Sequence, residues 1–141
     1  MAKYFTYLFI LVAIILLFSC SSGTWEDDKN NWQRAFNVAP SKGISIKHSW
    51  YWRSPHFTME QEYFFELEYS DSLEKEFLKA GDLVKVNSTE YQNINFFHHK
   101  PQWFVPRDFK FYDIYKSTQY EHYYLFIDRR NKNIFFTEFQ V

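Results

Sequence analysis

Apolar and polar residues alternate most regularly between residues 58 and 69, and this period of two predicts a β-strand with one buried face. The positions on the predicted inner face are Tyr63, Phe65, Leu67 and Tyr69. The positions on the predicted outer face are Glu60, Glu62, Phe64, Glu66 and Glu68. We therefore expect Phe65 and Leu67 in the core, with Glu66 and Glu68 in solvent or at the rim of the sheet.

Further segments have the composition and spacing of strands. They cover residues 44–51, 83–86, 109–116, 123–127 and 134–141. The last two are separated by six polar residues, 128–133, whose asparagines suit a left-handed turn position, so they predict a hairpin. Residues 87–100 are predicted to be a loop, and residues 101–106 to be an extended, proline-bracketed segment that buries Trp103 and Phe104.

Two helices are also predicted. Thr24 has the character of an N-cap, acidic residues follow it, and the apolar stripe that follows predicts a helix over 24–37 that ends before Pro40. The stripe consists of Trp25, Trp32 and Phe36. A second, shorter helix is predicted to begin after Ser70 and to end at Gly81, a residue type that favours helix C-termini.

This order of strands and helices favours an α+β fold. We expect a single domain over residues 24–141, with an antiparallel sheet of four to six strands and one or two short helices on one face. A domain of this size can bury one substantial hydrophobic core but not two independent ones.

The chain begins with an apolar run that stops abruptly before polar sequence. Residues 4–18 carry no charge, follow Lys3, and are too few to cross a bilayer, which needs about 20 residues. They match the apolar part of a signal peptide over residues 1–19. The motif at its end, Leu17-Phe18-Ser19-Cys20, resembles the lipobox of bacterial lipoproteins.

The lipobox resemblance implies cleavage before Cys20, a diacylglyceryl thioether on its sulfur and an acylated new N-terminus. Residues 20–23 would then be the lipidated end and a short tether, and the mature protein would be anchored in the membrane by its acyl chains. Ser21 follows the cysteine where an acid could stand. By resemblance to Gram-negative lipoproteins, this implies the outer membrane facing the periplasm, with the inner membrane and the cell surface as alternatives.

Composition limits the chemistry of the mature chain. Cys20 is the only cysteine, so once it is acylated no thiol remains for a disulfide, a thiolate metal site or a nucleophile. The formal net charge of −1 gives no broad positive field, so we expect no nucleic-acid partner. Aromatic residues make up 23% of the chain, which favours a ring-rich core over a stacking platform for sugars or bases.

Known catalytic and cofactor motifs are absent from the sequence. It contains no phosphate loop, no dinucleotide fingerprint, no HExxH and no GxSxG, and its three glycines are too few for backbone cradles. We therefore expect no cofactor, no metal and no catalysis. Two weaker alternatives are a metal site at His98 and His99, and a hydrolytic site at His56. The residues that could complete them are His122, Asp108 or Asp113 for the metal, and Glu60, Glu62, Ser49 or Ser54 for hydrolysis.

The strongest interaction candidate is the run Trp50-Tyr51-Trp52-Arg53. Three consecutive rings cannot share one face of a strand, so at least one is expected to point away from the core. Aromatic and arginine side chains are enriched at interface hot spots. Glu66 and Glu68, within the acidic row of the predicted strand, could add a docking surface for a basic partner.

These features favour a small envelope lipoprotein that acts as a non-catalytic binding or inhibitor protein on an envelope protein partner. Its size and anchor are similar to those of immunity proteins against periplasmic toxins. The alternatives are a structural or assembly accessory of an envelope or secretion machine and, less favoured, an enzyme that uses His56 or His98 and His99.

Overall fold

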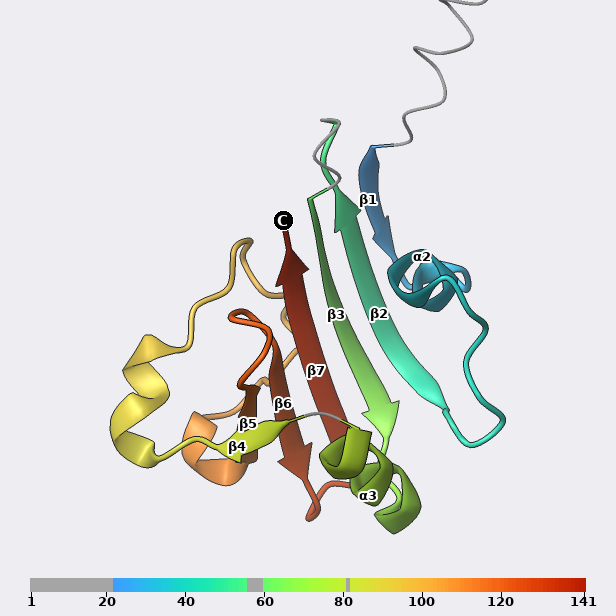
Figure 1. Cartoon of the computed structure of the whole chain (residues 1–141). Coiled ribbons are helices and arrows are strands. Elements are labelled where there is room, and N and C mark those ends of the chain that lie inside the picture. Colours follow the sequence, from blue (N-terminus) through green and yellow to red (C-terminus); the bar gives the residue numbers. More distant parts are fainter. Residues whose placement is uncertain (1–21, 56–59, 81) are drawn as a thin grey trace, which may run out of the picture.

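The computed structural model describes residues 22–55, 60–80 and 82–141. The described strands form one antiparallel sheet in the order β1-β2-β3-β7-β6-β5-β4 (Figure 1). The strands are β1 (Gly23–Glu26), β2 (Ile46–Arg53), β3 (Gln61–Glu68), β4 (Leu83–Lys85), β5 (Asp113–Ser117), β6 (Tyr124–Asp128) and β7 (Asn133–Gln140). The helices are α2 (Asn31–Phe36) and α3 (Asp71–Ala80), with 3₁₀ turns η1 (Ser88–Asn93) and η2 (Phe109–Phe111).

The fold is therefore mostly β, and the sheet of seven strands exceeds the predicted four to six. A single domain built on one sheet agrees only roughly with the predicted α+β class. The predicted signal peptide, Cys20, His56 and Gly81 lie outside the described residues.

The extra strand, β1, lies where the sequence predicted the start of a helix. Trp25 pairs with Tyr51 of β2, and the two ring centroids are 5.8 Å apart. Helix α2 begins only at Asn31, after a turn in which the Asp28 carbonyl accepts the Asn31 N–H at 2.9 Å. Pairing with an aromatic strand thus outweighs the local N-cap preference of Thr24.

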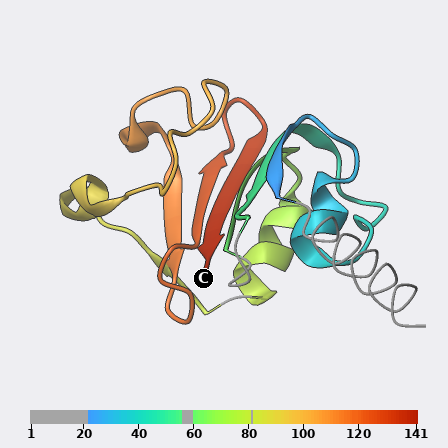
Figure 2. The same ribbon diagram turned by 90° about the horizontal axis from the view of Figure 1, so that it is seen from above.

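Both helices cover the same face of the sheet (Figure 2). The core on this face is rich in rings: Phe65 stacks on Phe136 at 5.1 Å, and Trp32 of α2 packs edge-on against Phe65 at 5.4 Å. Phe65 and Leu67 are fully buried here, which confirms their predicted place in the core. Edge-to-face and offset ring pairs of this kind add to the free energy gained from burial alone.

The opposite face carries a second core, because residues 86–112 fold back over it (Figure 2). We call these residues the covering segment. Phe64 lies fully buried in this core, with Phe104 of the covering segment packed edge-on at 4.8 Å. The expectation that Glu66 lies in solvent or at the rim is wrong. Glu62 and Glu66 are both buried on this face, and Glu62 is hydrogen-bonded to the covering segment, whereas Glu68 at the end of β3 is exposed. The sheet is thus the middle of three layers.

The predicted C-terminal hairpin is formed by β6 and β7. Asp128 pairs with Asn133, so the turn contains residues 129–132. Lys132, not an asparagine, takes the left-handed conformation, with φ of 57°. The Asp128 carboxylate holds the turn by accepting the backbone N–H and the side-chain amide of Asn131 at 3.1 and 2.9 Å.

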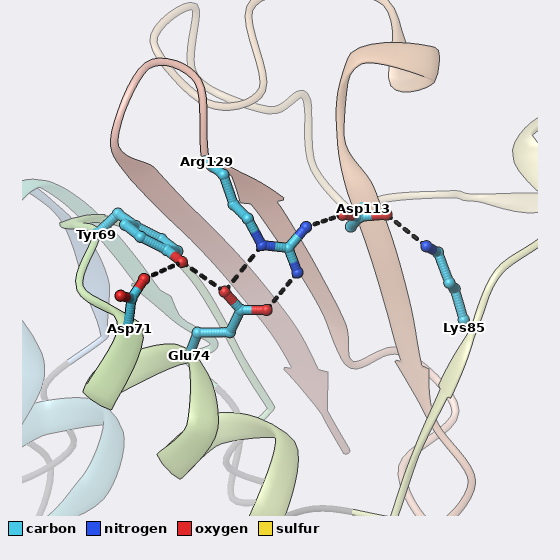
Figure 3. A network of polar contacts seen from close by, with 6 residues as sticks. All are labelled: Tyr69, Asp71, Glu74, Lys85, Asp113 and Arg129. Atoms are coloured by element: carbon cyan, nitrogen blue, oxygen red, sulfur yellow. Dashed lines mark hydrogen bonds and ion pairs between the residues drawn. The ribbon is translucent and has the colours of Figure 1, made fainter.

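A polar network ties α3 to the far edge of the sheet (Figure 3). Its members are Tyr69, Asp71, Glu74, Lys85, Asp113 and Arg129. Arg129, in the β6–β7 turn, donates to both Glu74 of α3 and Asp113 of β5. The hydrogen bond from Arg129 lowers the pKa of the Glu74 carboxyl. Burial raises the pKa of the Asp113 carboxyl, but hydrogen bonds from Lys85 and Arg129 outweigh the effect of burial and hold this pKa below its ordinary value.

Replacing Arg129 by alanine is expected to lower the free energy of unfolding at pH 7 by about 1–2 kcal/mol, since charge-assisted bonds are lost at a half-exposed site. Carboxyls whose pKa is lowered by folding stabilise the protein above their unfolded pKa of about 4, and this stabilisation disappears as pH falls through the folded value. The difference between wild type and Arg129→Ala, measured by urea unfolding, should therefore shrink between pH 7 and pH 3.

The exposed neighbour Arg130 in the same turn provides a matched control. Arg130→Ala should change the free energy of unfolding by no more than about 0.5 kcal/mol. A difference between wild type and Arg129→Ala that is the same at both pH values would show that the network does not stabilise the fold electrostatically.

Candidate functional site: an aromatic surface around Glu62 and His98

The run Trp50-Tyr51-Trp52-Arg53 is divided between the two faces of β2. Tyr51 points to the helix side, is 2% exposed and belongs to the core there. Trp50 and Trp52 point to the opposite side and are half-buried. The three rings thus do not share one face of the strand. The tryptophan side is not free of core packing, because Trp50 packs against Phe64 of the second core, and both tryptophans are only partly exposed there. Arg53 is half-buried at the end of the strand.

Glu62 occupies the centre of this surface. It pairs with Trp52 in the β2–β3 register and is only 1% exposed. Its carboxylate accepts the backbone N–H groups of Phe97 and His98 at 3.0 and 2.9 Å, and lies 2.7 Å from Nδ1 of His98. Because a carboxylate only accepts, the imidazole proton lies on Nδ1. These bonds fix the end of the covering segment onto the strand.

The rings around this pair form what we call the aromatic surface: Trp50, Trp52, Phe97, His98 and Phe139. The His98 ring lies 4.4 Å from Trp52 and 5.6 Å from Trp50. Phe97 stacks on Phe139 of β7 at 4.2 Å and is 58% exposed. Strands β2, β3 and β7 and one loop thus hold these rings in contact with one another. One side of the ring cluster remains open to solvent.

A second ring pair continues the surface along β2. His48, two residues before Trp50, stacks on Trp103 at 5.3 Å, and its Nδ1 lies 3.1 Å from Asp27. The indole N–H of Trp103 is buried without a hydrogen-bond partner in the described part of the chain. The period-two positions of β2 on this side therefore each meet a ring of the covering segment.

The acidic row proposed as a docking surface is not exposed as a row. Glu62 binds the covering segment, and Glu66 is 8% exposed opposite His48. Burial raises the pKa of the Glu66 carboxyl, while Lys47 and His48 partly oppose the rise. Of the two glutamates proposed for docking, Glu66 and Glu68, only Glu68 is exposed to solvent.

The residues considered for a metal site are not brought together. His98 faces Glu62, His99 is exposed, and His122 lies against Phe139 with a ring separation of 5.7 Å. Asp108 pairs with Lys110, and Asp113 belongs to the Arg129 network. Within residues 22–55, 60–80 and 82–141, no three His, Cys, Asp or Glu side chains are grouped to hold an ion.

The serines considered for hydrolysis with His56, a histidine outside the described residues, are both buried. Ser49 accepts a bond from the buried side chain of Asn31 at 3.1 Å, and the hydroxyl of Ser54 is buried without a partner in the described chain. The only pairing of acid and imidazole in the covering segment is that of Glu62 with His98. Sequence patterns missed it, because Glu62 lies on the strand face that was expected to be in solvent.

A scan against protein-family models, a search of curated proteins and a search of solved structures found no match. No helix among the described residues is long and apolar enough to cross a membrane.

Proposed function

We propose that the protein is a non-catalytic binding protein of the cell envelope, anchored by lipid at Cys20, and that it holds a protein partner through the aromatic surface. The single observation that carries the proposal is the set of half-exposed rings, His98 among them, arranged around the buried carboxylate of Glu62. Rings that are already ordered lose little conformational entropy on binding, and aromatic anchors dominate interface energetics.

The place of the surface in the domain suits a membrane-bound partner. Strand β1 begins at Gly23, three residues after Cys20, and three extended residues span at most about 11 Å. Gly23 pairs with Arg53, and Thr24 with Trp52, so the tryptophan end of β2 lies beside the anchored end of the domain. We therefore expect a partner whose binding site lies close to the membrane surface.

Truncating Trp52 to alanine is expected to weaken partner binding by about 2 kcal/mol or more, which is the hot-spot scale. Because the ring is half-exposed, thermal unfolding should change far less than for a core ring. The measurement combines quantitative pull-down from detergent-solubilised envelope with a binding titration against the captured protein. Phe111→Ala, which truncates a 51% exposed ring elsewhere, is the matched control.

Two results would refute this part of the proposal. One is equal capture by wild type and Trp52→Ala. The other is that every variant that loses the partner also unfolds. For the core residue Tyr51, loss of the partner together with unfolding is expected in any case.

The anchor is tested separately. Cys20→Ser should leave an uncleaved precursor that takes up no labelled palmitate, because the acylated sulfur is gone. Two or more acyl chains bind a bilayer far more firmly than one, so wild-type protein should remain in the membrane fraction after a salt wash. Absence of label in the wild type would refute lipidation without affecting the binding proposal.

The Glu62–His98 pair also favours a second candidate, an enzyme in which Glu62 orients His98 as a general base. A carboxylate that fixes the tautomer of an imidazole is the arrangement of many hydrolases. In the described chain no hydroxyl hydrogen-bonds to His98, so the nucleophile would be water. A hydrolytic activity that disappears in His98→Gln, with partner capture retained, would favour this candidate.

A further inference from the structure

A pocket of about 390 Å³ opens on the helix face of the sheet, away from the aromatic surface. Its walls are the end of α2, the side of α3, the start of β4 and the β5–β6 turn, and its floor is formed by β3 and β7. The residues that determine its chemistry are Phe36, Tyr63, Phe77, Tyr120, Tyr123 and Glu138. It is thus an aromatic pocket with a carboxylate in its floor.

Glu138 is buried in that floor. It pairs with Tyr63 in the β3–β7 register and is only 6% exposed, and the Tyr63 hydroxyl donates to its carboxylate. Among the described residues, no lysine, arginine or histidine lines the pocket, and none forms an ion pair with Glu138. A buried carboxylate without a cationic partner carries a substantial desolvation cost, which a bound cation would offset.

The pocket continues into an apolar groove of about 180 Å³ between the two helices. Phe36, Phe77 and Tyr123 line both cavities, and Trp32 and Phe136 extend the apolar lining. The charged residues around the two cavities are Asp82, Glu138 and Glu76, all of them acidic. The first pocket therefore carries two carboxylates, Asp82 and Glu138, whereas the groove is lined mainly by apolar side chains, with Glu76 among them.

Two of the pocket phenols, Tyr63 and Tyr123, keep their protons. Burial, together with the nearby Glu138 carboxylate, raises the pKa of Tyr63 and of Tyr123. Aromatic rings attract a cation that lies over their faces, so tyrosines in the lining of a pocket favour ammonium and guanidinium groups.

We propose that this pocket binds an organic cation with an apolar stem: the ammonium or guanidinium group against Glu138 and the tyrosine rings, and the stem along Phe36 and Phe77 toward the groove. A small free amine and the lysine or arginine side chain of a bound protein share this chemistry. The site is independent of the aromatic surface, which lies on the other face of the sheet.

The test uses the full lipidated protein in nanodiscs of phosphatidylcholine, with empty nanodiscs as background. Butylammonium and its neutral counterpart 1-butanol are titrated by saturation-transfer NMR. Wild type should bind butylammonium at least about tenfold more tightly than 1-butanol. Glu138→Gln, which keeps the shape and an acceptor for Tyr63, should remove this difference, whereas Glu68→Gln removes an exposed carboxylate of β3 and should leave it unchanged.

Tyr120→Ala gives a second variant at the rim, where a 58% exposed ring can be removed without disturbing the core. It should weaken butylammonium binding about threefold or more, while Trp52→Ala should have no effect. Nα-acetyl-lysine methylamide is titrated in parallel: tighter binding than butylammonium identifies a side chain as the natural occupant, and weaker binding a free amine. Equal binding of butylammonium and 1-butanol, or butylammonium binding that is the same in Glu138→Gln, would overturn the proposal.

Discussion

Replacing Phe64 by alanine is expected to lower the free energy of unfolding by about 3–5 kcal/mol, as much as replacing its neighbour Phe65. The two residues point to opposite faces of β3, yet both are fully buried. Phe64 packs against Trp50 at 5.4 Å and Phe104 at 4.8 Å, so its removal leaves a cavity that the sheet cannot close. Chemical denaturation of both variants measures the two losses.

Glu68→Ala is the control for this comparison, because Glu68 is the exposed residue at the end of the same strand. It should change the free energy of unfolding by no more than about 0.5 kcal/mol. If Phe64→Ala were as mild as Glu68→Ala while Phe65→Ala remained severe, the covering segment would not pack on the sheet in solution.

The periodicity of the sequence predicts the strands well and the layers less well. Alternation assigns Phe65 and Leu67 to one face, and that assignment holds. It cannot tell whether the other face is covered, since Glu62 and Glu66 have the composition of a solvent face. That face is covered by residues 86–112, a segment without a regular hydrophobic period, whose place over the sheet is set by tertiary contacts such as those of Phe104 and Val105.

The helix predicted from Thr24 shows the same limit. Capping and amphipathic spacing are local signals, and they predict the end of α2 correctly, where Asn37 closes the helix with a left-handed conformation. The start is wrong because Trp25 gains more from pairing with β2 than from a helical turn. Strand pairing is a long-range interaction that a local window does not contain.

The sequence predicts individual residues of the candidate site but not their arrangement in space. The tryptophans of β2 and His98 each stand out from the sequence, for different reasons. What joins them is the carboxylate of Glu62, 36 residues before His98 in the chain. The hydrogen bonds between these two residues follow from the sheet register and the return of the loop, which no spacing along the chain encodes.

Removing the Glu62 carboxylate tests that assembly directly. Glu62→Ala is expected to lower the free energy of unfolding by about 2–4 kcal/mol, because two backbone N–H groups and an imidazole lose their acceptor at a largely buried site. The amide hydrogens of Phe97 and His98 should exchange with solvent much faster than in wild type, while those of the β6–β7 hairpin should change only with global stability.

Glu62→Gln distinguishes positioning from simple destabilisation. Its amide keeps the volume and one acceptor oxygen, but its NH₂ group faces a donor, so the loop should loosen while the sheet remains intact. If the aromatic surface binds through rings held in place by Glu62, this folded variant should lose partner affinity by a factor of about ten. Retained affinity together with faster exchange at Phe97 and His98 would show that the rings bind without preorganisation, and that Glu62 serves the fold alone.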